Sequence, residues 1–278
     1  MSDITEANKR AWNANASSYD SKPWQQKVVT QITEAIHAHA TWLGLTSSPP
    51  KDRIRLLDYA CGPGTVTRAL LPYITEAKGI DLSEGMVAAY NERMSTESLP
   101  SHMTTPPSAA EGNLFAREPT PSLSEEGYSD FDVAAVGLGF HHFENPALSV
   151  QRLAERLRPG GVVFIIDLLP PSEDPNSTGD FVAHHRAHGH GHGHGHSHAH
   201  DHGTEHAEPA PELDQNAKDI LASIHQDGFT SADMELLFSN AGLVDFGYVT
   251  LEEPLHMEML GHQAVRTPFF AKARKPMA

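Results

Sequence analysis

The sequence predicts an α/β protein built on a mostly parallel sheet. Short apolar runs that are typical of strands alternate along the chain with segments of helical periodicity. The first such run, residues 54–57, passes through the small-residue turn 58–64 into a helical segment at residues 65–71. A strand that breaks through Gly-x-Gly into a helix lets a ligand approach bare backbone at the carboxyl edge of a parallel sheet.

Composition limits the class of protein. The chain has 278 residues, 39% of them apolar, which is enough for one large α/β domain with a substantial core. Because no apolar run approaches the length of a membrane-spanning helix, we expect no membrane span. The formal net charge of −16 repels phosphate backbones, so we expect no nucleic-acid partner.

Cysteine content and the start of the chain bear on the compartment. A single cysteine, Cys61, excludes an internal disulfide framework and fits a reducing compartment. The polar residues at the start show no signal-peptide pattern. We therefore expect a cytoplasmic location, with the nucleus as the other candidate. We interpret Cys61 as a small packing residue rather than a nucleophile, because no histidine is paired with it in the sequence.

An acidic residue follows the second expected strand. Residues 77–81 form that strand, and Asp81 closes it seventeen residues after Gly64. A carboxylate there can accept hydrogen bonds from both hydroxyls of a ribose, so the turn and the acid together predict a nucleoside-cofactor site. A dinucleotide fingerprint would need a third glycine, and Thr67 occupies that position.

The remaining elements follow from periodicity and capping residues. Two helices are expected before the first strand, at residues 4–16 and 24–43, joined to the core by a short linker at residues 47–50. The later expected elements, in chain order, are a helix from the cap Ser83 to residue 94, a weak strand at 108–112, a strand at 131–136, a helix begun by Asn145 and Pro146, a strand at 162–166, helices at 214–225 and 230–241, and β-rich segments at 243–251 and 264–273.

Two histidines, His141 and His142, follow the fourth expected strand. They would lie at the carboxyl edge of the sheet, where open α/β sheets bind ligands. Either one is a candidate for the pocket wall, for a general base, or for a purely structural role. Asp167 ends the fifth strand at the same edge, where it either orients a histidine, contacts a substrate or faces solvent.

Three sequence blocks together are specific. They are L-D-x-A-C-G-x-G-T at residues 57–65, I-D-L-S-x-x-M at 80–86 and L-R-P-G-G at 157–161. Through them the chain resembles the class I S-adenosylmethionine-dependent methyltransferases, and is similar to the ubiquinone/menaquinone-biosynthesis group, over residues 53–169 and 213–275. The resemblance implies a Rossmann-like, seven-stranded, mostly parallel sheet with an antiparallel last strand, helices on both faces and an N-terminal helical lid.

The resemblance also implies a division of the chain. Residues 1–50 would form the lid, residues 51–169 and 213–278 the cofactor-binding core, and residues 170–212 an insertion. In the lid, Trp12, Tyr19 and Trp24 would be pocket walls, although these aromatic residues would equally serve to attach the helices to the sheet. Residues 252–261 would lie near the acceptor pocket.

S-adenosylmethionine is the cofactor that the resemblance implies. The turn backbone would hold its methionine moiety, Asp58 would orient the turn or meet the ammonium group through water, and Asp81 would bind the ribose. Ala60 stands where relatives often have glycine, which is tolerable if its φ is negative. Asn113 stands where relatives usually have aspartate. The expected cofactor-binding residues are Tyr19, Asp58, Ala60, Cys61, Gly62, Gly64, Asp81, Leu82, Met86, Asn113, Leu114 and Gly137.

The implied activity is methyl transfer to a small organic acceptor through O, N, C or S. A base is needed only where the proton of the acceptor must leave early. His141 and His142 are the catalytic candidates for that role. Methylation of a protein side chain is one alternative. A non-catalytic regulatory or metal-binding protein that retains the cofactor fold is another.

The insertion holds eleven of the nineteen histidines. Its alternating Gly and His residues offer no apolar surface to bury, which predicts a mobile loop. Imidazoles at this density bind zinc, nickel or copper loosely, but their spacing fits no fixed structural metal site. We favour an unstructured insertion with incidental metal affinity over a metal-responsive regulatory role. The candidates for loose binding are His188, His190, His192, His194, His196, His198, His200 and His202.

Overall fold

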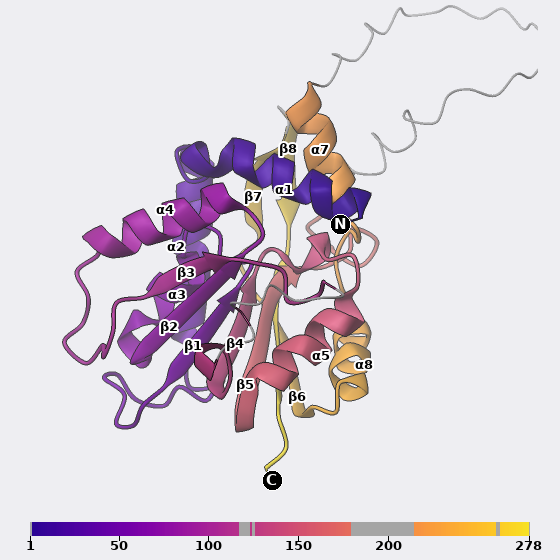
Figure 1. Ribbon diagram of the computed structural model, residues 1–278. Helices are drawn as coiled ribbons and strands as arrows, with labels where there is room; N and C mark the ends of the chain where they lie inside the picture. Colours follow the sequence, from indigo (N-terminus) through magenta and orange to yellow (C-terminus); the bar gives the residue numbers. More distant parts are fainter. Residues whose placement is uncertain (1, 117–122, 124–125, 179–213, 260–261, 278) are drawn as a thin grey trace, which may run out of the picture.

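The computed structural model describes residues 2–116, 123, 126–178, 214–259 and 262–277. The strands of its central sheet are β1 Arg55–Tyr59, β2 Glu76–Asp81, β3 Ser108–Glu111, β4 Phe131–Gly137, β5 Leu157–Leu168, β6 Val244–Thr250 and β9 Pro268–Arg274. They form seven strands in the order β3-β2-β1-β4-β5-β9-β6 (Figure 1). Only β9 pairs antiparallel with its neighbours β5 and β6. The expected mostly parallel, seven-stranded sheet is confirmed.

Helices cover both faces of this sheet. They are α1 Asp3–Asn15, α2 Pro23–Ala38, α3 Thr65–Leu70, α4 Glu84–Thr96, α5 Pro146–Arg156, α7 Gln215–Ser223 and α8 Ser231–Asn240, with short 3-10 turns η1 Ala16–Ser18, η2 Leu71–Tyr73, η4 Glu126–Tyr128 and η5 Phe140–His142. In β1, Leu56 packs into the apolar core under α2 and α3, and Leu57 into the core under α5 and α8. Burial on both faces explains why the parallel strands are continuous apolar runs.

Local capping signals in the sequence give the correct helix starts. The Ser83 hydroxyl accepts a hydrogen bond from the Met86 amide at the start of α4, and Asn145 caps α5 in the same way. At the start of α8, Thr230 and Asp233 form a reciprocal capping box. These starts depend only on residues close in sequence, so the sequence predicts them well.

A β-hairpin that the sequence did not predict lies beside the main sheet. The β-rich segment expected at residues 264–273 divides at Thr267 into β9 and β8 His262–Arg266, and β8 pairs antiparallel with β7 Leu255–Met259. The division has a physical cause. The amide and hydroxyl of Thr267 donate to the carboxylate of the buried Asp174, at 2.7 and 2.6 Å, which interrupts the strand pairing.

Two further boundaries differ from those expected. Helix α2 ends at Ala38 instead of continuing to residue 43. Strand β5 begins at Leu157, ahead of the expected residue 162, because Leu157 pairs with Phe131 of β4. The Pro-Gly-Gly turn therefore lies within the strand as an irregular stretch.

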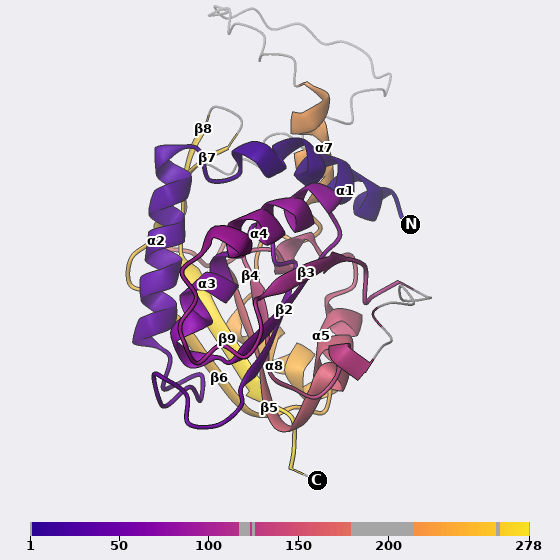
Figure 2. The ribbon, with the colours of Figure 1, turned by 60° about the vertical axis from the view of Figure 1, so that its left-hand side comes forward.

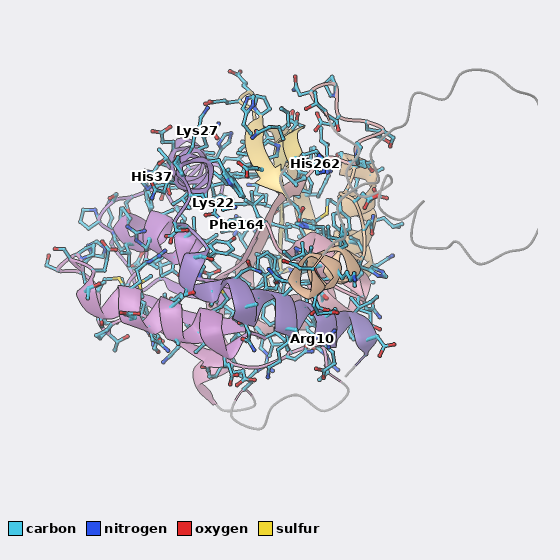
Figure 3. All side chains as sticks on the ribbon, turned by 90° about the horizontal axis from the view of Figure 1, so that it is seen from above. Arg10, Lys22, Lys27, His37, Phe164 and His262 are labelled. Carbon is cyan, nitrogen blue, oxygen red and sulfur yellow. The ribbon has the colours of Figure 1, made fainter. Side chains whose placement is uncertain are left out.

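The carboxyl edge of the sheet is covered by elements that are distant in sequence. Helix α1 crosses above this edge with α7 beside it, and α2 lies against β7 (Figures 2 and 3). The guanidinium of Arg10 on α1, labelled in Figure 3, donates to both oxygens of Asp219 on α7, at 3.1 and 2.9 Å. Among the described residues, no helix is both long and apolar enough to span a membrane.

Candidate active site

The covered edge of the sheet contains two cavities. The first, of about 160 Å³, is lined by the turn after β1, the ends of β2 and β4, and α1. It brings together eight of the expected cofactor residues: Tyr19, Ala60, Gly62, Asp81, Leu82, Met86, Asn113 and Gly137. The other four, Asp58, Cys61, Gly64 and Leu114, are not among its lining residues.

Asp81 joins the ends of β1 and β2. Its two carboxylate oxygens accept hydrogen bonds from the Gly62 amide at 2.8 Å and the Ser83 amide at 2.9 Å. Burial raises the pKa of this carboxyl, and the amide hydrogen bonds oppose that rise. Asp81 therefore fixes the turn while remaining part of the cavity wall.

The two glycines of the turn have different surroundings. A Cβ on Gly62 would meet nothing within 4 Å, so this residue presents open backbone beside the cavity. A Cβ on Gly64 would lie 2.6 Å from the terminal methyl of Met94, and Gly64 has a φ of +91°. The left-handed backbone at Gly64 therefore favours glycine independently of any ligand, and the side chains of α4 leave little room for a Cβ.

Ala60 has a φ of +53°, so the condition under which alanine would be tolerable here, a negative φ, is not met. The chain leaves β1 through this residue, and the next amide, that of Cys61, donates to the Ile80 carbonyl at 3.2 Å. A left-handed backbone at a non-glycine residue costs on the order of 1 kcal/mol. The cavity wall therefore contains a strained residue that its surroundings must hold in place.

Cys61 and Asp58 lie behind the turn. Cys61 is buried with Tyr90 and Met94, and burial, followed by the charges of Asp81 and Asp58, raises the pKa of its thiol. One oxygen of Asp58 accepts from the amide and hydroxyl of Thr67, and the other is buried without a hydrogen-bond partner in the described part of the chain. Burial raises the Asp58 pKa to about 7 against the opposing Thr67 hydrogen bonds.

Tyr59 organises the segment after β3, a role that sequence reasoning missed. Its hydroxyl accepts from the Leu114 amide at 3.3 Å and donates toward the Asn113 side-chain oxygen at 3.5 Å. That oxygen also accepts from the Phe115 amide at 2.8 Å. Asn113 therefore lines the first cavity, and Leu114 is buried beneath it. The strand pattern of residues 54–59 gave no reason to single out this tyrosine.

The second cavity is larger, about 390 Å³. It is mainly apolar, and α2, α7 and the β7–β8 hairpin contribute much of its wall. Its apolar lining includes Trp12, Trp24, Val28, Val29, Ile32, Val66, Leu138, Leu168, Ile220, Ile224, Met257 and Ala264. Residues 257 and 258 place part of the segment 252–261 here. Of the α2 and α7 residues, only Trp24 was expected as a pocket wall. The others were missed, because the apolar face of a helix looks in the sequence like ordinary core.

The two cavities are neighbours. Five residues line both of them: Trp12, Tyr19, Gly137, Leu138 and His142. Burial, followed by the charges of Asp81 and Asp20, raises the Tyr19 pKa to about 12, which keeps the hydroxyl protonated. Because the two cavities share these lining residues, a ligand in the first cavity would lie next to a ligand in the second.

His141 and His142 have different partners. Nδ1 of His141 lies 2.9 Å from one oxygen of the fully buried Asp167, and the His141 amide donates to the other at 3.0 Å. Nδ1 of His142 lies 3.1 Å from the Ser223 carbonyl oxygen. His142 packs against the edge of Trp12, with ring centroids 5.3 Å apart. His141 lines the second cavity only, and His142 lines both.

The electrostatics of the pair follow from these partners. Burial alone would raise the pKa of Asp167. The positive charge available on His141 and the hydrogen bonds from His141 and Leu168 outweigh burial and lower it. Burial, and then the neighbouring His141, lower the pKa of His142 to about 3, so His142 is neutral at physiological pH.

Within the part of the chain that the structure describes, no group of three or more His, Cys, Asp or Glu side chains is arranged to hold a metal ion. The eight histidines expected to bind metal loosely lie between residues 188 and 202, outside the described residues.

Comparison with known proteins gives the family. A family model described as a methyltransferase domain matches residues 31–245. An uncharacterized methyltransferase of Schizosaccharomyces pombe is 29% identical over 120 residues, which is 43% of this chain and 40% of that protein. The aligned part is therefore less than half of the fungal protein.

Solved structures agree in fold. A SAM-dependent methyltransferase from Anabaena variabilis is 20% identical with a TM-score of 0.56, and the match covers 99% of this chain and 96% of that one. Haemonchus contortus phosphoethanolamine N-methyltransferase 2 is 12% identical with a TM-score of 0.60, covering 100% and 61%. At these identities the likeness shows the fold alone.

The family match spans most of the chain and contains the turn after β1, Asp81 and both cavity histidines. The strand order with its antiparallel β9, and the open backbone facing the first cavity, agree with it. The chain therefore belongs to the methyltransferase domain family.

Proposed function

We propose that the protein transfers a methyl group to a small organic acceptor bound in the second cavity. The observation that supports this most directly is the wall that the two cavities share, formed by residues from α1, the end of β4 and η5. S-adenosylmethionine would supply an activated methyl group. What the protein adds is the alignment of the two reactants and the exclusion of water.

The residues of the first cavity fit this cofactor. The open backbone at Gly62 suits the methionine moiety, and Asp81 suits the ribose hydroxyls. Leu82 and Met86 offer apolar surface for the adenine ring, and Asn113 a polar edge. Behind the turn, Asp58 would orient the turn or meet the cofactor ammonium group through water, since one of its buried oxygens has no hydrogen-bond partner among the described residues.

The lining of the second cavity favours a small molecule over a protein side chain. Residues of α1, α2 and α7 and of the β7–β8 hairpin surround a volume of about 390 Å³ with mainly apolar surface, which suits a compact apolar acceptor. We further propose that residues 1–50 act as a lid, because α1 contributes to both cavities. Incubation with methyl-labelled cofactor and fractionated cell extract separates the alternatives. Label in small molecules supports the proposal, and label only in protein bands or nowhere contradicts it.

Asp81→Ala tests the cofactor site. Loss of the carboxylate removes the ribose partner and releases the Gly62 amide, so we expect S-adenosylhomocysteine to bind at least tenfold more weakly, or about 1.4 kcal/mol. Isothermal titration calorimetry measures the change. Glu155→Ala is the matched control, because Glu155 is an exposed acid on α5 that should leave affinity unchanged. Equal affinity in wild type and Asp81→Ala would refute the assignment.

A further inference from the structure

The two histidines differ in what their free nitrogens can do. A carboxylate only accepts hydrogen bonds, so Nδ1 of His141, at 2.9 Å from Asp167, carries the hydrogen. Nε2 of neutral His141 then holds a lone pair. The second hydrogen bond to Asp167, from the His141 amide, prevents the carboxylate from turning away. His141 is thus held in one tautomer and one orientation.

His141 also has a counter-ion for the charge that a base acquires. Asp167 is 0% exposed, and its hydrogen bonds come from His141 and the Leu168 amide. An imidazolium at His141 would sit beside this buried anion and be stabilised by it. Asp167 therefore lies where a histidine that accepts a proton needs its counter-ion.

His142 lacks that support. Its ring nitrogen Nδ1 faces the neutral carbonyl of Ser223, and its ring packs against Trp12. The side chain is buried, and a positive charge there would be placed beside His141, whose ring centroid is 4.1 Å away. His142 is therefore suited to form a neutral wall between the cavities, and not to accept a proton.

The walls of the second cavity limit the acceptor. Aliphatic and indole side chains from α2, α7 and the hairpin dominate the lining. Such a surface favours a largely apolar molecule, with aromatic rings a good match for its size of about 390 Å³. The presence of a base then indicates which nucleophilic group the acceptor carries. A neutral amine attacks through its own lone pair and an aromatic thiol ionises by itself near neutral pH, whereas a hydroxyl must lose its proton.

We propose that His141, positioned by Asp167, removes the proton from a hydroxyl group of a largely apolar, ring-sized acceptor, so that the protein catalyses O-methylation. This inference rests on the function proposed above. The acceptor O–H proton moves to Nε2 of His141, and the oxygen forms a bond to the methyl carbon. The carbon–sulfur bond breaks and its electron pair stays on sulfur. His141 then returns the proton to solvent.

Three isosteric acceptors test this inference: naphthol, naphthylamine and naphthalenethiol. We expect the wild-type protein to methylate naphthol. In His141→Asn, we expect kcat with naphthol to fall at least about 100-fold, the usual contribution of a general base. With naphthalenethiol, which is already ionised, kcat should change less than about threefold. A merely structural role for His141 would lower both activities equally.

Two further variants serve as comparisons. His142→Asn should lower both activities by the same factor, because His142 acts only as a wall. His256→Asn should change neither, because His256 is an exposed histidine of β7 outside both cavities.

Three results would overturn the inference: equal losses with naphthol and naphthalenethiol in His141→Asn, wild-type activity on the amine or thiol but not on naphthol, or no activity on any of the three. S-adenosylhomocysteine binding by the wild-type protein is measured in parallel. Binding without the predicted activity overturns only the acceptor class, whereas absence of binding contradicts the proposed function itself.

Discussion

Asp58 shows how burial changes the ionisation of a single carboxyl group. Its carboxylate is 1% exposed, and one of its oxygens has no hydrogen-bond partner among the described residues. Burial raises its pKa from 3.8 to about 7. Between these two values the unfolded chain has lost the proton that the folded protein keeps, so folding is favoured less as pH rises through this window. For this one carboxyl group, the free energy of unfolding falls by about 4 kcal/mol across the window.

Asp58→Asn is predicted to flatten this pH dependence. The free energy of unfolding of the wild-type protein should fall more steeply between pH 5 and pH 7 than that of the variant, whose amide cannot ionise. Urea unfolding at several pH values measures both. Asp52→Asn, at an exposed aspartate, should follow the wild type. Parallel curves for wild type and Asp58→Asn would show that Asp58 does not cause the slope.

At the same scale, the site could be predicted in part from the sequence. Asp81 and Gly62 line the first cavity as their motif implied. Gly64 is in the same motif but lies against Met94 and has a left-handed backbone, since ligand approach and a left-handed φ both favour glycine and cannot be told apart from the sequence. Similarly, the sequence correctly predicted that His141 and His142 lie at the carboxyl edge of the sheet. Only the positions of Asp167 and Ser223 distinguish the two histidines.

At the scale of elements, predictability follows sequence separation. The starts of α4, α5 and α8 depend on caps three residues away, and they were predicted. The division between β8 and β9 depends on the contact of Thr267 with Asp174, 93 residues earlier, which no local pattern reveals. The second cavity was unpredictable for the same reason, since its walls come from helices and a hairpin that only the folded chain brings together.

Asn13 ties α1 to the start of α4 beside the first cavity. Its side-chain oxygen accepts from the Ser83 hydroxyl at 2.6 Å and from the Gly85 amide at 3.1 Å. These groups begin α4, directly after Asp81. Asn13 therefore couples the position of α1 to the wall of the first cavity.

Asn13→Ala should weaken S-adenosylhomocysteine binding about three- to tenfold, because α1 loses its fixed position over the first cavity. Leaving the Gly85 amide unpaired should also lower the free energy of unfolding by about 1 kcal/mol. Calorimetry and urea unfolding measure the two effects. Lys9→Ala removes an ion pair with Glu111 from the same helix and should leave the affinity unchanged. If both variants bound S-adenosylhomocysteine equally well, the attachment of α1 through Asn13 would have no effect on ligand binding.

At the scale of the whole molecule, the first cavity connects parts of the chain that local sequence does not relate. Residues from α1, the β1 turn, the end of β2 and the end of β4 all line the first cavity. Helix α1 is bound in turn to α7 through Arg10 and Asp219, 209 residues apart. A ligand that contacts these elements at once binds only the folded arrangement, so its binding free energy adds to the stability of the entire fold.

This linkage predicts a thermal shift. At a concentration about 100 times its dissociation constant, S-adenosylhomocysteine should stabilise the wild-type protein by about 2.7 kcal/mol, which raises Tm by roughly 5 °C for a chain of this length. Differential scanning calorimetry with and without the ligand measures the shift. Asp81→Ala at the same ligand concentration should shift less, in proportion to its weaker affinity. A wild-type Tm that is independent of ligand concentration would mean that the edge of the sheet does not bind the cofactor, since a ligand specific for the folded state cannot avoid stabilising it.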